Sequence, residues 1–173
     1  MRRLSRLLVL LALLLTGTVT AGAETAAFRL RDVGGQTVDL ADLCAKGPVL
    51  LSFWATYCEP CKKEIPHLIE LQKQFAAQKL QLALIAVDSP RSQKQIKPYA
   101  ASKGWTVPVL LDANGQVMKK LKGSNPPYTM LVNGKGEVLY SHSGYKPGDE
   151  KALGKELARL LGAEPAAAPA TGH

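Results

Sequence analysis

The hydrophobic pattern of the chain switches between strand-like and helix-like stretches. Two nearly continuous apolar runs, at residues 49–55 and 80–88, are typical of central strands covered on both faces. The residues between them, 60–78, carry apolar side chains at helical spacing and predict a helix that joins two parallel strands. Pro60 suits the first turn of this helix, and Pro66 inside it predicts a kink.

Shorter elements complete the predicted order. The alternating segments 28–33 and 37–40, separated by Gly34-Gly35, predict an N-terminal β-hairpin, and Asn133-Gly134 predicts a second hairpin. The pattern also predicts helices at 92–102, 116–121 and 150–161, and strands at 107–112, 128–132 and 137–143. The strand–helix–strand crossover implies parallel strands, and the second hairpin adds antiparallel ones. We therefore predict an α/β fold with a central mixed β-sheet flanked by helices on both faces.

The first residues have the composition of an export signal. Arg2, Arg3 and Arg6 precede an apolar stretch at 7–15, and Ala21-Gly22-Ala23 forms a small-residue cleavage pattern. The apolar stretch is much shorter than the roughly 20 residues of a spanning helix, although an uncleaved, weakly anchoring segment stays open as an alternative. The predicted organisation is a signal peptide at 1–23, a domain at 24–162 and a disordered Ala/Pro tail at 163–173, with a periplasmic location.

The charge of the chain argues against a nucleic-acid function. The sequence has 22 basic and 14 acidic residues, a net charge of +8. Without the three leader arginines the balance is 19 to 14, or +5. The lysines are scattered, and aromatic residues make up only 6% of the chain. We therefore expect a solvated basic surface and no nucleic-acid partner.

Two cysteines mark the candidate chemistry. Cys58 and Cys61 stand where the apolar run 49–55 ends and the helical pattern begins. A helix N-terminus offers unpaired N–H groups and a partial positive charge, which stabilise the thiolate form of cysteine. Cys44 is the odd cysteine, and we expect it to be buried as a small hydrophobe rather than to form an alternative or intermolecular disulfide.

Three roles compete for Cys58 and Cys61: a redox pair, half of a zinc site, or a structural disulfide. Structural zinc usually needs four ligands, and the three histidines, His67, His142 and His173, are scattered. A structural disulfide across so small a loop would remove little entropy from the unfolded chain. The strand–CxxC–helix context therefore favours the redox pair.

Three segments carry a family resemblance, at residues 53–66, 109–112 and 127–132. Their sequences, FWATYCEPCKKEIP, VLLD and PYTMLV, resemble the thioredoxin-like superfamily, and most of all its exported disulfide reductases of the TlpA/ResA type. The resemblance extends over residues 27–161. It implies a thioredoxin fold with an N-terminal β-hairpin, in agreement with the order of elements predicted above.

The resemblance also implies roles for single residues. Cys58 would attack a client disulfide, and Cys61 would resolve the mixed disulfide. Pro127 would be a cis-proline that faces the dithiol, where an extended client peptide can lie. Glu64 would assist proton transfer, although the residues alone allow almost equally a solvated ion pair with Lys62 or Lys63. The residues expected at the client groove are Trp54, Tyr57, Pro60, Pro126, Pro127 and Tyr128.

The sequence departs from the family pattern beside the cysteines. Tyr57 stands where a second tryptophan is common, and Pro126 precedes the predicted cis-proline in place of a small residue, so the client cannot be carried over from the family. Asp88 is a loose counterpart of the family's strand-end acid. Glu59 adds a negative charge between the sulfurs, which should oppose thiolate formation and favour a reducing dithiol.

The predicted function is that of an exported thiol–disulfide oxidoreductase, a protein-disulfide reductase that acts as a monomer. It would need no cofactor beyond the redox-active Cys58–Cys61 disulfide. Its partners would be exported proteins with disulfides or paired cysteines, by resemblance including apocytochrome c in cytochrome c maturation, and a membrane electron donor. The rival hypothesis is a copper-handling metallochaperone that uses the same cysteines, for which His67 is the candidate nearby ligand.

Overall fold

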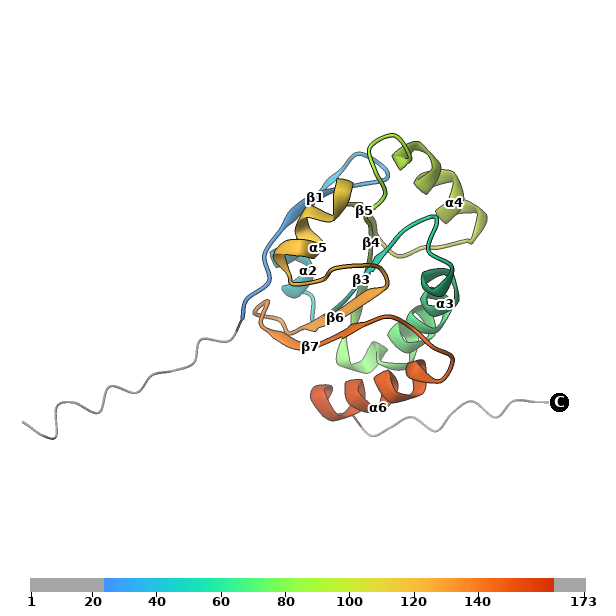
Figure 1. Ribbon diagram of the computed structural model, residues 1–173. Helices are drawn as coiled ribbons and strands as arrows, with labels where there is room; N and C mark the ends of the chain where they lie inside the picture. The colour runs from blue at the N-terminus through green and yellow to red at the C-terminus, as the bar shows by residue number, and fades with distance from the viewer. Residues whose placement is uncertain (1–23, 164–173) are drawn as a thin grey trace, which may run out of the picture.

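A seven-stranded mixed β-sheet forms the centre of the protein (Figure 1). In this computed structural model residues 24–163 are described, and the predicted signal peptide at 1–23 and residues 164–173 of the predicted tail lie outside this range. The strand order is β2-β1-β5-β4-β3-β6-β7. The strands are β1 (Arg29–Asp32), β2 (Thr37–Asp39), β3 (Val49–Trp54), β4 (Gln81–Ala86), β5 (Val109–Leu111), β6 (Tyr128–Val132) and β7 (Val138–Ser143).

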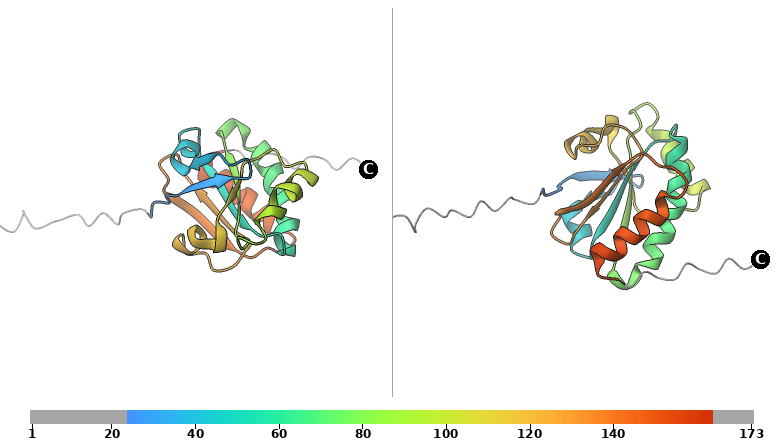
Figure 2. Two further views of the ribbon diagram at one scale, coloured as in Figure 1. Left: turned by 90° about the horizontal axis from the view of Figure 1, so that it is seen from above. Right: turned by 60° about the horizontal axis from the view of Figure 1, so that its bottom comes forward.

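Helices cover both faces of the sheet (Figure 2). On one face lie α3 (Glu59–Gln74), α4 (Ile96–Ser102) and α6 (Asp149–Leu161), and on the other lie α2 (Leu40–Cys44) and α5 (Gln116–Lys120). Short 3₁₀ helices are present at η1 (Ala76–Gln78), η2 (Gln93–Gln95) and η3 (Ala113–Gly115). No helix within residues 24–163 is long and apolar enough to cross a membrane. The predicted thioredoxin fold, with its mixed sheet, helices on both faces and N-terminal hairpin, is confirmed.

The central strands explain the apolar runs in the sequence. β3 pairs in parallel with β4 and antiparallel with β6, and all six of its residues are buried. Because helices cover both faces of the sheet, side chains on either face of β3 are buried, and the run shows no alternation of apolar and polar residues. The parallel strands β3 and β4 are joined by α3, as the sequence predicted.

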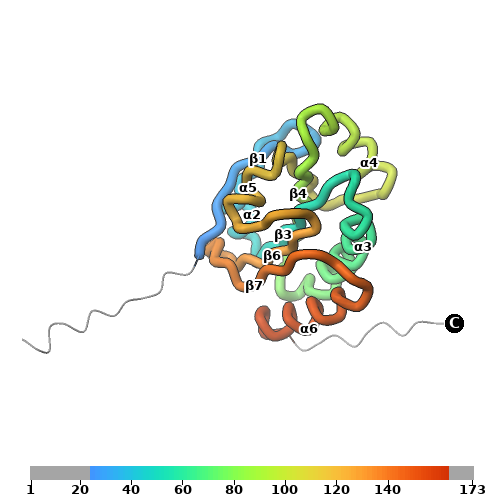
Figure 3. Tube along the Cα trace, in the orientation of Figure 1, coloured from blue at the N-terminus to red at the C-terminus, as the bar shows by residue number. Residues whose placement is uncertain are grey.

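The N-terminal segment contacts both halves of the sheet (Figure 3). Thr25 forms an isolated β-bridge with Glu137, at the turn between β6 and β7, and β1 then pairs antiparallel with β5. Cys44, at the end of α2, is free and buried, as expected from the sequence. Burial raises the pKa of the Cys44 thiol, which keeps it in the neutral, unreactive form.

Several element boundaries differ from the sequence prediction, and two of them show the cause clearly. Leu40, predicted to end a strand, begins helix α2, because the Asp39 carboxylate accepts a hydrogen bond from the Ala41 N–H (3.1 Å) and caps the helix. The helix predicted over 60–78 ends at Gln74, and the chain continues in the separate 3₁₀ turn η1. Both differences arise from backbone hydrogen bonding at an element end, which hydrophobic spacing does not specify.

The buried carboxylate of Asp112 provides a test of the fold. Asp112 follows β5, is 2% exposed and accepts the N–H groups of Val117 and Met118, both at 2.9 Å. Asp112→Ala leaves both donors unpaired, and we expect it to lower the free energy of unfolding by about 1–3 kcal/mol in urea denaturation. Asp42→Ala, at an exposed position of α2, is the control and should cost less than about 1 kcal/mol. Equal effects of the two substitutions would contradict the role assigned to Asp112.

Candidate active site

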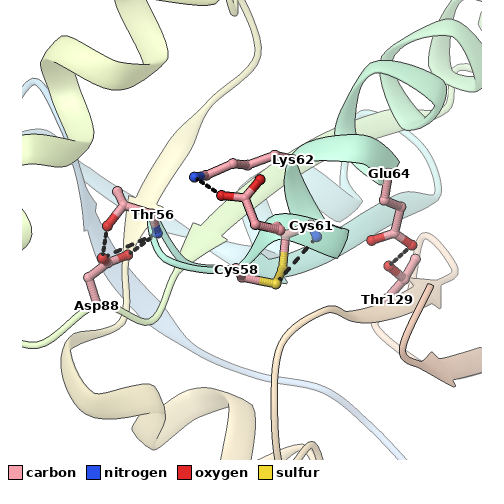
Figure 4. Close-up of a disulfide and its surroundings, with 8 residues drawn as sticks. Thr56, Cys58, Cys61, Lys62, Glu64, Asp88 and Thr129 are labelled. Atoms are coloured by element: carbon pink, nitrogen blue, oxygen red, sulfur yellow. Dashed lines mark hydrogen bonds and ion pairs between the residues drawn. A yellow bond between two sulfur atoms is a disulfide. The ribbon is translucent and has the colours of Figure 1, made fainter. Parts of the chain in front are cut away.

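The disulfide between Cys58 and Cys61 closes at the N-terminus of α3 (Figure 4). Cys58 is the N-cap residue, and its sulfur accepts the Cys61 backbone N–H at 3.3 Å. Cys58 is 6% exposed and Cys61 is fully buried. The unpaired N–H groups and partial positive charge of the helix end therefore mainly stabilise a thiolate at Cys58, the more accessible of the two cysteines.

Asp88 holds the turn that leads into the disulfide. It follows β4 and is fully buried, and its two carboxylate oxygens lie 3.1 and 3.2 Å from the Thr56 backbone N. The Thr56 hydroxyl also donates to Asp88 (Figure 4). Since β3 and β4 are parallel neighbours, their ends meet at one edge of the sheet, and Asp88 fixes the loop that carries Cys58. From the sequence alone Asp88 is only a loose counterpart of the family's strand-end acid, although an aspartate directly after an apolar run is a recognisable signal.

Glu64 is a buried acid on the same helix as the cysteines. It is 4% exposed, and the Thr129 hydroxyl donates to its Oε1 at 3.0 Å (Figure 4). Oε2 has no hydrogen-bond partner among the described residues. Burial raises the pKa of Glu64 to about 7, against the lowering effect of the Thr129 hydrogen bond, and the Asp149 charge adds to the rise. The alternative of a solvated ion pair with a neighbouring lysine is therefore wrong.

The charge of Glu59 is matched by a lysine one turn further along α3. Lys62 Nζ lies 2.7 Å from Glu59 Oε1, and this hydrogen-bonded pair lowers the pKa of Glu59 and raises the pKa of Lys62. The ammonium group also lies 5.7 Å from the centre of the Tyr99 ring. The opposition to thiolate formation predicted for Glu59 is consequently weakened, because the Lys62 ammonium group offsets the negative charge of Glu59.

A surface groove of about 560 Å³ is lined by Tyr57, next to Cys58 in the chain, and by Pro126. Its other walls come from the loops after β4, from η3 and α5, and from the loop that precedes β6. Tyr57 is 69% exposed, which is exceptional for a large hydrophobic side chain in the described part of the chain. An exposed aromatic ring above a groove is a suitable contact for a client peptide. Pro60 is also exposed, in the first turn of α3.

The other predicted groove residues lie beneath the surface. The Pro126–Pro127 peptide bond is cis, as the resemblance implied, and Pro127 is buried. Trp54 is fully buried against the rings of Tyr99 and Trp105, with ring centres 5.6 and 5.0 Å away. Tyr128 is 5% exposed, and its hydroxyl donates to the Leu121 carbonyl at 2.9 Å. Trp54 and Tyr128 thus support the site from within. Because they are buried, the direct contact with a client expected of them does not agree with the structure.

In the described part of the chain, metal ligands do not gather around the cysteines. Within residues 24–163, no group of three or more His, Cys, Asp or Glu side chains is arranged to hold a metal ion. His67, the candidate copper ligand, is exposed on α3, and its ring stacks with that of Tyr145 at 6.2 Å.

The raised pKa of Glu64 makes stability depend on pH. The folded state holds this proton more tightly than the unfolded state, so the stabilising contribution is full below about pH 4.5 and is lost as the pH rises through about 7. Relative to Glu64→Gln, we expect the free energy of unfolding of the natural protein to fall by about 3 kcal/mol across that range. Urea denaturation as a function of pH measures it. Glu70→Gln, at an exposed site of the same helix, should leave the pH dependence intact, and a flat difference between natural protein and Glu64→Gln would refute the assignment.

Known proteins resemble this chain in sequence and in fold. The family model described as the AhpC/TSA family matches residues 21–141. The thiol-disulfide oxidoreductase ResA of Bacillus subtilis is 36% identical over 122 residues, which are 70% of this chain and 66% of ResA. The ResA of Halalkalibacterium halodurans is 32% identical over 124 residues, which are 72% of this chain and 69% of that protein. The chain thus spans about two thirds of the length of these curated relatives.

A solved structure agrees with these relatives. The crystal structure of a Chlorobium tepidum protein, assigned as the thiol:disulfide interchange protein DsbE, has a TM-score of 0.72 and 26% identity. The match covers 80% of this chain and 96% of that protein. The predicted enzyme class, thiol–disulfide oxidoreductase, is the class that the two curated relatives bear in their names, and it is confirmed at that level. The chain therefore belongs to the AhpC/TSA family of thioredoxin-like proteins.

Proposed function

We propose that the protein is an exported protein-disulfide reductase, which passes two electrons from the Cys58–Cys61 dithiol to disulfides of other exported proteins. The observation that carries this proposal is the disulfide at the N-terminus of α3, with the more exposed sulfur beside a groove and a buried acid on the same helix. The ResA relatives, named thiol-disulfide oxidoreductases, support the same chemistry.

The reaction follows from the different burial of the two sulfurs. The Cys58 thiolate, stabilised by the Cys61 N–H and the helix end, attacks one sulfur of the client disulfide and forms a mixed disulfide. The client S–S bond breaks in this step, and the other client sulfur leaves as a thiolate that takes up a proton. Cys61 then loses its proton and attacks Cys58 Sγ. The Cys58–client bond breaks, the client leaves as a thiolate that takes up a proton, and the protein is left oxidised.

Glu64 is the proposed acceptor of the Cys61 proton. It lies three residues further along α3, so the two side chains are on neighbouring positions of one helix face. A carboxyl group with a pKa of about 7 is about half ionised at neutral pH and can take up a proton and give it back. When ionised it also disfavours a second negative charge on sulfur, which supports a reducing dithiol over a strongly oxidising one.

The location and the partners of the reductase are part of the proposal. The composition of residues 1–23 supports export to the periplasm, a compartment that is kept oxidising. A reductase there needs a supply of electrons, so we infer a membrane electron donor that re-reduces the disulfide. Apocytochrome c, whose haem-attachment cysteines must stay reduced, is one client that suits the resemblance, and misoxidised exported proteins are another.

Trapping of the mixed disulfide tests the proposed function. Cys61→Ser removes the resolving sulfur, so Cys58 should remain covalently bound to its client. We expect complexes that disappear on reduction, recovered from cells by affinity capture under non-reducing conditions and identified by mass spectrometry. The double variant Cys58→Ser, Cys61→Ser is the control and should trap nothing. A natural protein that fails to accelerate insulin reduction, together with an empty Cys61→Ser trap, would overturn the proposal.

The proton-accepting role of Glu64 predicts a selective kinetic defect. In the reaction of the reduced protein with dithiodipyridine, attack by Cys58 and attack by Cys61 each release one thiopyridone, so stopped-flow absorbance separates the two steps. Glu64→Gln should slow the second step by at least about tenfold at neutral pH, which is a modest share of what a positioned acid or base contributes. The first step should change much less, and equal slowing of both steps would argue against the assigned role.

A further inference from the structure

A row of polar side chains crosses the sheet beneath α3. Ser52 on β3 is paired with Thr129 on β6, and Thr129 is paired with His142 on β7. Residues directly opposite each other in antiparallel strands point to the same face. That face is the one covered by α3 and α6, because Thr129 donates to Glu64 of α3. The row therefore leads from a central strand to the edge strand β7.

The row runs from a buried end to an exposed end. Ser52 is fully buried and Thr129 is 1% exposed, whereas the His142 side chain is 42% exposed. At the inner end, Ser52 Oγ and Glu64 Oε2 are both buried and lack a hydrogen-bond partner among the described residues. Buried polar atoms nearly always have a partner in the protein or a water molecule. Two such oxygens, on residues that pair with or hydrogen-bond to Thr129, are suited to hold water.

A cavity of about 50 Å³ adjoins this row, between α3, α6 and the strands β6 and β7. Glu64, Thr129 and His142 line it, so it connects the buried acid with the exposed end of the row. A buried water needs only about 10–15 Å³ of such space, so the cavity has room for a short chain of waters. The remaining titratable groups around it are Tyr140 on β7, Tyr145 in the loop before α6, and Asp149 and Glu150 on α6.

The outer end of the cavity carries charged groups that meet solvent. His142 Nε2 lies 3.7 Å from Asp149 Oδ2, and the Asp149 side chain is 40% exposed. The Tyr145 hydroxyl donates to Glu150 at 2.9 Å, and burial together with this bond raises the pKa of Tyr145 to about 12, so it stays protonated. The half-exposed side chains of His142 and Asp149 thus form the solvent end of the cavity, between β7 and α6.

The cavity and the client groove are separate. The groove beside Tyr57 and Pro126 is built from the loops after β3, β4 and β5 and the loop before β6, and it shares no lining residue with the cavity. A client bound over Cys58 would cover the groove and exclude water from the disulfide. The cavity would still open between β7 and α6.

We propose that the polar row and its cavity form a proton route between Glu64 and solvent that stays open while a client covers the dithiol. The proposal rests on the proposed function, because it needs Glu64 to accept the Cys61 proton. In the resolving step the thiol proton of Cys61 passes to the Glu64 carboxylate as the sulfur bonds to Cys58 Sγ and the client leaves as a thiolate. Glu64 then gives its proton to cavity water, which passes it beyond the His142–Asp149 pair, and the client thiolate takes its proton from solvent.

A substitution that closes the cavity tests the route. Ala152 is exposed on α6 and lines the cavity, so Ala152→Phe should plug its mouth. The reduced protein is mixed with insulin, whose chains cover the active-site face, or with dithiodipyridine, which leaves that face open to water. Rapid acid quenching and mass analysis follow the mixed disulfide. We expect Ala152→Phe to slow the resolving step about tenfold with insulin and to leave it unchanged with dithiodipyridine.

The control is Ala101→Phe, which places the same ring at an exposed position of α4 in a groove remote from the cavity. It should match the natural protein with both substrates. Equal rates for the two variants with insulin would overturn the route, and so would equal slowing with insulin and dithiodipyridine, which would indicate a distorted Glu64. If the natural protein itself does not react with insulin, it is the proposed function that fails. Ala152→Leu replaces Ala152→Phe if circular dichroism shows that the latter is unfolded.

Discussion

The pairing of β3 with its two neighbours is the constraint on which the site depends. Because β4 runs parallel to β3, Asp88 at its end meets Thr56 and fixes the turn before Cys58. Because β6 runs antiparallel to β3, its first residues lie beside the end of β3, which places Thr129 under α3 within reach of Glu64. Local sequence would not bring these groups together, and a register shift by one residue would turn Thr129 to the opposite face.

Glu59 and Glu64, both on α3, differ in their effect on the stability of the protein. Glu59 is exposed and pairs with Lys62, and ion pairs at the surface contribute little to stability. Glu64 is 4% exposed, and keeping it ionised in the folded protein costs about 3 kcal/mol, the equivalent of its raised pKa. An apolar side chain at this position would avoid that cost. The placement of an acid there is therefore better explained by proton transfer than by stability.

Much of the architecture could be predicted from the sequence, whereas the inner half of the site could not. The apolar run of β3, the turn at Asn133-Gly134 and the CxxC spacing are local patterns, and each had the expected outcome. The burial of Glu64 depends on Thr129, 65 positions away, and on the cover provided by α6. Strand register and helix docking decide such contacts, and hydrophobic periodicity contains neither. The family motif identifies Trp54 and Tyr128 as residues near the cysteines, but it does not specify how deeply each side chain is buried. Their expected position at the groove surface therefore differs from the structure.

The depth of Cys61 raises a problem that a single buried base does not solve. A fully buried thiol cannot lose its proton directly to water, and the proposed acceptor, Glu64, lies at almost the same depth. If Glu64 had no outlet, the proton would only move from one buried group to another, and a bound client would hold it there. A cavity that begins at Glu64 and ends at the half-exposed side chains of His142 on β7 and Asp149 on α6 removes this restriction. In the proposed reaction, electrons and client use the face around Cys58, while protons use the opposite end of the polar row, so that water can be excluded from the disulfide without stopping the reaction.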